Sequence, residues 1–294
     1  MERYRKKISI LLICLAIACL IVAGVLTLIQ KQKNRQSENK LDQYRVEAED
    51  ITPAPVTPAP TETADTTESD SSDSVPTPEA EAMPTPVPTP VAVANPYEAA
   101  YLDNEHMVGW LMVDGTNIDY PVMWTPGDEN YYLYRGFDGS EDLNGCLILD
   151  TDSSLNPLTT NLIIHGHNMK SGAMFGNLTD YEDKSYYEEH KYITLYTEEC
   201  KRNYEIIAVF RSQVYKKTDN VFKFYKFFQA NTEAEFDDFY SNIKKLSIYD
   251  TGVTAEFGDN FITLSTCVYH VNNGRFVVVA KEIEPGENYI PLKR

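Results

Sequence analysis

The stretch Phe261-Ile262-Thr263-Leu264-Ser265-Thr266-Cys267 is followed eight residues later by Arg275, the first residue of the apolar run RFVVVAKEI over 275–283. The runs 261–266 and 275–283 are apolar and rich in β-branched residues, so both predict strands. The sequence Asn272-Asn273-Gly274 between them is typical of a turn. If the two strands pair as antiparallel neighbours, Cys267 and Arg275 face each other at the mouth of one loop.

The pairing of Cys267 with Arg275 predicts a nucleophilic thiol. A fixed positive charge favours the thiolate, which is the form of cysteine that attacks a carbonyl carbon. The alternative interpretation is a buried free cysteine beside a surface arginine, and for an isolated cysteine that outcome is the commoner one. The choice between the two depends on whether the chain also supplies a base.

A candidate base follows an upstream strand. The apolar segment 161–164 (NLII) leads into His165-Gly166-His167. Imidazole is the side chain best suited to moving a proton near neutral pH. His167 lies just past the predicted strand end, where side chains leave the sheet edge, so we predict that His167 takes part in catalysis. We expect His165, two positions earlier, to be a strand or pocket-wall residue.

These motifs resemble those of sortases, and within that family of class B, the membrane-anchored cysteine transpeptidases of Gram-positive bacteria. The matching segments cover roughly the last two-thirds of the chain, in the expected order. They are LSTC at 264–267 with Arg275, GHNM at 166–169 followed by Met174-Phe175 and Leu178, GWL at 109–111, and GTNIDYPV at 115–122. His165 departs from the family pattern, in which an aromatic residue such as Tyr is more usual.

The resemblance implies a mainly β fold, an eight-stranded sortase-type β-barrel with an N-terminal helix and a long helix inserted between strands six and seven. The residue pattern agrees, because short β-patterned runs recur along residues 96–294. These runs are 109–113, 117–122, 146–150, 162–165, 192–197, 204–211, 261–266 and 275–283. Residues 96–106 predict an entry helix, and 233–246 predict a helix with one apolar face and a capping box formed by Thr232 and Glu235.

The resemblance also implies the chemistry. Cys267 would attack a backbone carbonyl in the C-terminal sorting signal of an exported protein and form a thioacyl intermediate. His167 would transfer protons and Arg275 would stabilise charge on the carbonyl oxygen. An amine of the peptidoglycan cross-bridge would then resolve the thioester, with no cofactor or metal. Ser265 and Thr266, which precede the nucleophile, are candidate substrate-binding residues, and Ser265 is expected on the same strand face as Cys267.

The N-terminal part predicts a membrane protein. Residues 8–29 form an almost unbroken apolar segment long enough to span a bilayer, after a basic N-terminus at 1–7 that we expect in the cytoplasm. A cleaved signal peptide is the alternative, with a shorter apolar core. Residues 30–95 predict a disordered Pro/Thr/acid-rich spacer, and 96–294 the catalytic domain. The sequence thus predicts a single-pass protein of the cell membrane, with its catalytic domain outside and facing the cell wall.

The net charge and the cysteines bear on the partner class and on the choice of nucleophile. The formal net charge of −18 argues against a nucleic-acid partner, since phosphate binding requires concentrated Lys and Arg. Of the five cysteines, Cys14 and Cys19 lie in the apolar segment, while Cys146 and Cys200 lack the strand and arginine that flank Cys267.

Two other classes of function remain open from the residues alone. His165 and His167 with Cys267 could ligate zinc in a metal-dependent hydrolase. Alternatively, an anchor, a spacer and a β-domain also describe a non-catalytic surface adhesin.

Overall fold

The structure is a computed structural model of the chain, and it describes residues 2–45, 94–284 and 289–292. The described helices are α1 (Glu2–Leu41), α2 (Glu98–Asp103), α3 (Lys184–Glu189) and α4 (Glu233–Leu246), with 3-10 helices η2 (Tyr131–Tyr134), η3 (Leu178–Glu182) and η4 (Phe224–Lys226). The strands are β1 (Met107–Met112), β2 (Asp119–Met123), β3 (Leu147–Leu149), β4 (Asn161–Gly166), β5 (Tyr192–Thr197), β6 (Lys201–Gln213), β7 (Phe261–Cys267) and β8 (Gly274–Glu284).

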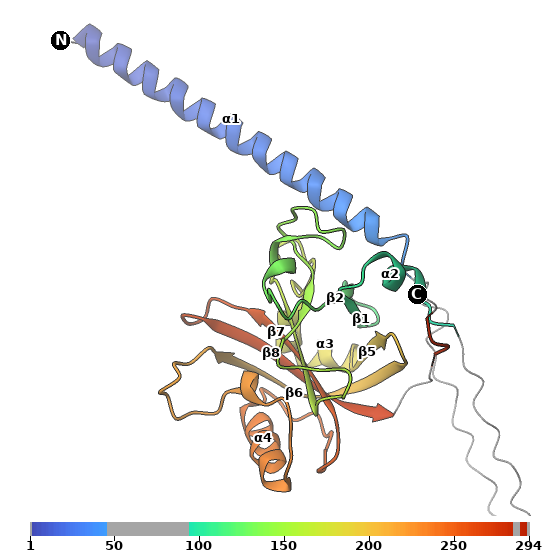
Figure 1. The fold of residues 1–294 in the computed structure, drawn as a ribbon. Coiled ribbons are helices and arrows are strands. Elements are labelled where there is room, and N and C mark those ends of the chain that lie inside the picture. The colour runs from blue at the N-terminus through green and yellow to red at the C-terminus, as the bar shows by residue number, and fades with distance from the viewer. Residues whose placement is uncertain (1, 46–93, 285–288, 293–294) are drawn as a thin grey trace, which may run out of the picture. The chain divides into compact units, whose positions relative to one another are not determined.

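The eight strands form a closed barrel in the order β1-β2-β3-β4-β7-β8-β6-β5 (Figure 1). The pairs β2–β3 and β4–β7 are parallel, and the other neighbours are antiparallel. The predicted mainly β barrel is therefore confirmed. The entry helix is shorter than predicted: α2 covers 98–103, whereas 96–106 were expected.

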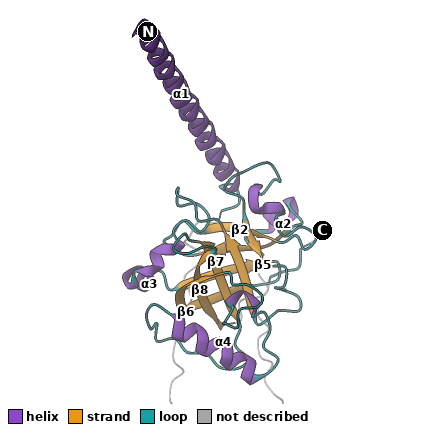
Figure 2. Cartoon of the chain, turned by 90° about the vertical axis from the view of Figure 1, so that its left-hand side faces the viewer, coloured by secondary structure: helices purple, strands orange, loops and turns teal. Residues whose placement is uncertain are grey.

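The two faces of the barrel wall pack against different partners. Leu162, Ile164 and Leu264 belong to the larger buried cluster, which most of the barrel strands share. Phe261 and Val277 belong to a second cluster, formed with Phe236, Phe239 and Ile243 of α4. Since side chains alternate along a strand, residues 261, 263, 265 and 267 of β7 share the face on which α4 packs. That face is the outside of the barrel, as the position of α4 in Figure 2 shows.

Helix α4 begins and ends at the predicted residues and lies between β6 and β7 in the chain. Its aromatic side chains pack against the barrel, with the Phe239 ring 5.3 Å from that of Phe261 between centroids. The predicted capping box is present: the Thr232 side chain accepts from the Glu235 backbone N–H, and the Glu235 carboxylate accepts from the Thr232 backbone N–H.

Removing this cap gives a testable effect on stability. We expect Thr232→Ala to lower the free energy of unfolding by about 1 kcal/mol, because the N–H of Glu235 loses its acceptor. Urea denaturation followed by circular dichroism measures the change. Thr232→Ser retains the hydroxyl and is the matched control, so an equal loss in both variants would contradict a capping role.

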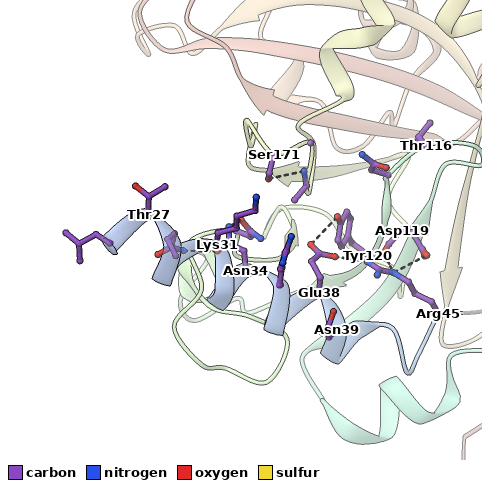
Figure 3. A pocket seen from close by; sticks show the side chains of 17 residues that line it. Thr27, Lys31, Asn34, Glu38, Asn39, Arg45, Thr116, Asp119, Tyr120 and Ser171 are labelled. Carbon is purple, nitrogen blue, oxygen red and sulfur yellow. Dashed lines mark hydrogen bonds and ion pairs between the residues drawn. The ribbon is translucent and has the colours of Figure 1, made fainter. Parts of the chain in front are cut away.

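One described segment, Leu12–Leu41 of α1, is long and apolar enough to cross a membrane. The polar end of α1 contacts the barrel. Leu41 is buried in the core cluster, and Arg45 lies 3.0 Å from Glu38 Oε2 and 3.2 Å from Asp119 Oδ2. Figure 3 shows Glu38 and Arg45 directed toward Tyr120 and Asp119 of β2, at the edge of a cavity of about 1070 Å³. This cavity contains none of the predicted catalytic residues.

Helix α1 continues to Leu41, past residue 30, where the spacer is predicted to begin. Residues 30–41 contain neither Gly nor Pro and are mostly good helix formers, so the helix extends into polar sequence. The described residues on either side of 46–93 contact neighbouring side chains. Arg45 forms an ion pair with Asp119, and Asp119 accepts a hydrogen bond from Trp110. The Tyr97 ring stacks on Trp110, with 4.5 Å between ring centroids. Residues 46–93 lie outside the described part, so the predicted spacer there stays a prediction.

Candidate functional site

The β7–β8 hairpin places Cys267 opposite Arg275. The two residues are register partners in the antiparallel ladder, at the end where the hairpin loop begins. Cys267 is exposed, whereas every other residue of β7 is buried. The predicted arrangement of a thiol beside a guanidinium at one loop mouth is therefore present.

The parallel pairing of β4 with β7 brings His167 to the same end. Gly166 pairs with Thr266, so the next residues along the two strands are His167 and Cys267. Past the strand end the two segments stay linked, because Asn168 Nδ2 donates a hydrogen bond to the Cys267 carbonyl oxygen at 3.0 Å. His167, just past the end of β4, thus forms one row with Cys267 of β7 and Arg275 of β8, which we call the catalytic row after the role that the sequence predicts for it.

All three residues of the catalytic row line one groove of about 570 Å³ on the outer face of the barrel. Its walls come from the segment around η2, the end of β3, and the segment around η4. The lining residues outside the catalytic row are Glu129, Asn130, Leu133, Tyr134, Ile148, Leu149, Asp150, Thr151, Asp152, His165, Gly166, Val214, Phe224, Tyr225, Lys226, Ser265 and Thr266.

The orientation of His167 is set by η2. Its Nε2 lies 2.8 Å from the Leu133 carbonyl oxygen, and the Tyr134 ring packs against the imidazole with 5.3 Å between centroids. Because a carbonyl oxygen only accepts, Nε2 must carry a hydrogen. Nδ1 is therefore the nitrogen of His167 that can accept and return a proton. Sequence reasoning missed this partner, since a backbone carbonyl leaves no signal in the residue pattern.

Arg275 keeps its hydrogen-bonding capacity for a ligand. Its guanidinium donates from Nη1 to the carbonyl oxygens of Gly274 at 3.0 Å and Asn273 at 3.4 Å. Within the described residues no carboxylate forms an ion pair with it. The remaining N–H groups are free to bind a carbonyl oxygen in the groove.

Ser265 and Thr266 differ in orientation. Ser265 is 1% exposed and lines the groove on the face of Cys267, and its Oγ has no hydrogen-bond partner in the described residues. Thr266 also borders the groove, but its hydroxyl donates to the Gly166 carbonyl at 2.7 Å. The Thr266 hydroxyl therefore links β7 to β4, while the Ser265 hydroxyl has no structural partner.

His165 lies on the groove wall, as expected, and forms a pair that the sequence did not predict. Its Nε2 is 3.0 Å from Asp150 Oδ2. Burial raises the pKa of Asp150, but the hydrogen bonds from His165 and from the Asp152 backbone outweigh it, so the pKa of Asp150 lies below its usual value. Asp150 is therefore ionised at neutral pH.

The other two cysteines of the domain are unsuited to nucleophilic attack. Cys146 and Cys200 are buried. Burial raises the pKa of the Cys146 thiol, with a further increase from nearby Asp142, so the thiolate is disfavoured. Cys200 is hydrogen-bonded to Thr197 within its turn. Among the described cysteines of the domain, only Cys267 is exposed.

In the described part of the chain, no group of three or more His, Cys, Asp and Glu residues could hold a metal ion. The zinc hypothesis therefore has no ligand set among these residues. His165 is paired with Asp150, and His167 with a backbone carbonyl. A cationic guanidinium on the same row would also oppose a bound metal ion.

Comparison with known proteins gives a consistent result. Residues 111–283 match the Sortase domain family. The chain is 34% identical to sortase B of Listeria monocytogenes over 180 residues, covering 60% of this chain and 70% of that protein. It is 29% identical to sortase B of Staphylococcus aureus over 194 residues, covering 64% of this chain and 75% of that protein.

Solved structures agree with the sequence matches. The structure of a Staphylococcus aureus sortase B–substrate complex has a TM-score of 0.58 and 28% identity, covering 66% of this chain and 87% of that chain. Sortase B from Bacillus anthracis has a TM-score of 0.56 and 30% identity, covering 64% and 84% respectively.

Proposed function

The chain belongs to the sortase family, and to its class B, so it is a cysteine transpeptidase; we propose that Cys267, His167 and Arg275 carry its reaction. The observation that best supports this assignment is the catalytic row. Strand pairing brings a thiol, an imidazole and a guanidinium from three segments into one groove. The adhesin hypothesis gives no reason for this convergence.

The first half-reaction is acylation. The Cys267 thiolate attacks the carbonyl carbon of the scissile peptide bond, and the carbonyl oxygen takes up negative charge. Arg275 donates hydrogen bonds to this oxyanion. When the C–N bond breaks, Nδ1 of protonated His167 gives its proton to the departing amine, and a thioacyl enzyme remains. The Nε2–H bond to Leu133 holds the imidazole in place during the transfer.

The second half-reaction joins the acyl group to an amine. The proposed donor substrates are exported proteins with a C-terminal sorting signal, and the proposed acceptor is an amine of the peptidoglycan cross-bridge. The family supports both assignments, and one of the similar solved structures is a complex of Staphylococcus aureus sortase B with a substrate. The net charge of −18 is compatible with a cationic acceptor.

We also propose that α1 anchors the enzyme in the membrane with the barrel on the outer side. The contacts of Leu41 and Arg45 support a direct connection, in which α1 itself holds the barrel near the bilayer.

The function is tested with the full-length protein in detergent micelles. The substrate is a peptide carrying the C-terminal motif of an exported protein from the same genome, and the acceptor is a cross-bridge peptide. We expect cleavage and a new amide-linked product, both detected by mass spectrometry. A thiol-reactive probe should label Cys267 selectively, while no cleavage of any such motif would reject the assignment.

The two histidines are expected to differ in their effect on cleavage. His167→Ala should slow peptide cleavage by about 100-fold to 10,000-fold, because the leaving amine loses its proton donor. His165→Ala should be milder and leave the first turnover close to that of the unmodified enzyme, since His165 pairs with Ser265, two residues before the thiol. Initial cleavage rates of the two variants measure the difference. The reverse order would show that His165 is the proton donor for cleavage.

A further inference from the structure

The Asp150–His165 pair lies in the groove next to the catalytic row. His165 pairs in register with Ser265, two residues before Cys267, and both border the same groove. Two residues along a strand correspond to about 7 Å. A ligand group that contacts both His165 and an acyl chain on Cys267 therefore needs to span only about this distance.

The geometry of this pair makes His165 a proton acceptor. The ionised Asp150 carboxylate accepts from Nε2–H and leaves Nδ1 as the basic nitrogen. Nδ1 has no hydrogen-bond partner in the described residues, and the side chain is 35% exposed. A carboxylate behind an imidazole both fixes the tautomer and stabilises the imidazolium that forms when the ring takes a proton.

The charges around the pair favour a cation. The carboxylates of Glu129, Asp150 and Asp152 line the groove. The facing positive charges are Lys226, which lies 3.8 Å from Asp152, and Arg275 at the far side of the catalytic row. His167 is the other titratable imidazole that faces the groove. Of these carboxylates, Asp150 is bonded to His165 and Asp152 follows two residues later, so we expect the groove at His165 to attract an ammonium group.

We propose that His165, backed by Asp150, is the base that deprotonates the incoming ammonium group of the acceptor in the second half-reaction. This inference rests on the proposed transpeptidase function. It divides proton transfer between two imidazoles: His167 serves the departing amine, and His165 prepares the arriving one.

An acceptor R–NH3⁺ gives one proton to Nδ1 of His165 and becomes R–NH2. Its nitrogen attacks the thioester carbonyl carbon, a C–N bond forms, and the C–S bond breaks with both electrons going to Cys267. A second proton leaves the nitrogen for Nδ1 of His167, which was left neutral by the first half-reaction. The third hydrogen stays on the new amide, and His165 returns its proton to solvent.

The test compares two amines with full-length protein in detergent micelles. The ε-amine of Nα-acetyl-lysine amide has a pKa of about 10.4 and is almost entirely protonated at neutral pH, so it needs a base. Hydroxylamine is a weakly basic amine that is largely unprotonated at the same pH. His165→Gln is the key variant, because its side-chain amide can still donate to Asp150 but cannot take up a proton.

We expect His165→Gln to slow transfer to the lysine amine by about 100-fold, the lower end of general-base effects. Its first-turnover burst of peptide cleavage and its transfer to hydroxylamine should equal those of the unmodified enzyme. Asp150→Asn should show the same selective loss. The melting temperature of each variant identifies a folding defect, and the hydroxylamine reaction measures activity in the same sample.

Three results would overturn the inference. Unchanged transfer to the lysine amine would remove the need for His165, and equal losses with both amines would indicate a structural role. A reduced cleavage burst would place His165 in the first half-reaction. If the unmodified enzyme forms no thioacyl intermediate at all, the proposed function itself fails, and the inference fails with it.

Discussion

Replacing Cys267 with alanine is expected to abolish peptide cleavage, with a loss of 10,000-fold or more, on the order of that seen when other enzymes lose a covalent nucleophile. Cys267 is the exposed thiol of the domain and lies opposite Arg275. Without its sulfur no thioacyl intermediate forms, and the remaining groups of the groove cannot replace a covalent step. The rate of peptide cleavage under single-turnover conditions measures this loss.

Cys146→Ala and Cys200→Ala are the controls within the same domain. Both thiols are buried, and neither lines the groove. These variants are expected to retain cleavage, with any change confined to stability. Cys267→Ser tests whether the shape of the residue or its sulfur matters, and it should be as inactive as the alanine variant. Retained cleavage in Cys267→Ala would end the assignment of the nucleophile.

Arg275→Ala is expected to lower kcat/KM by about 100-fold to 1,000-fold, the effect of losing one oxyanion donor. The two hydrogen bonds of the guanidinium in the free enzyme go to carbonyl oxygens of its own hairpin. Arg275 lines the groove, and its remaining N–H groups would bind the carbonyl oxygen as negative charge develops. The reduction should therefore appear mainly in kcat, which responds to interactions made in the transition state.

Arg275→Lys separates charge from geometry. Lysine keeps the positive charge but lacks the planar fork of donors, so we expect only partial recovery of kcat. The free energy of unfolding should change by less than about 0.5 kcal/mol in either variant, because Arg275 forms no ion pair in the described residues. Normal kcat in Arg275→Ala would contradict the role of oxyanion donor.

The hairpin and the upstream histidine could be predicted because their signals are local. β-branched runs, a turn sequence and the position of His167 past a strand end fix which residues reach the sheet edge. Strand β5 and helix α4 have the predicted bounds. The eight-stranded barrel came instead from the family resemblance, and the order of its strands was not predicted, since residue patterns alone do not say which strands pair.

The partners of the two imidazoles could not be predicted. The Leu133 carbonyl lies 34 residues from His167 in the chain, and Asp150 lies 15 residues from His165. Each pairing depends on how β3, β4 and η2 meet in three dimensions. Helix α1 also continues beyond the predicted apolar segment, because residues 30–41 are polar but mostly helix-forming.

In the proposed reaction, Cys267 forms a covalent bond with the substrate in a groove shared with His167 and Arg275. Mass spectrometry of the full-length protein, quenched after mixing with a sorting peptide and no acceptor, tests it most directly. We expect a mass increase equal to the acyl fragment on the proteolytic peptide containing Cys267, and release of this fragment by neutral hydroxylamine. Turnover with no adduct, or an adduct on a different residue, would contradict it.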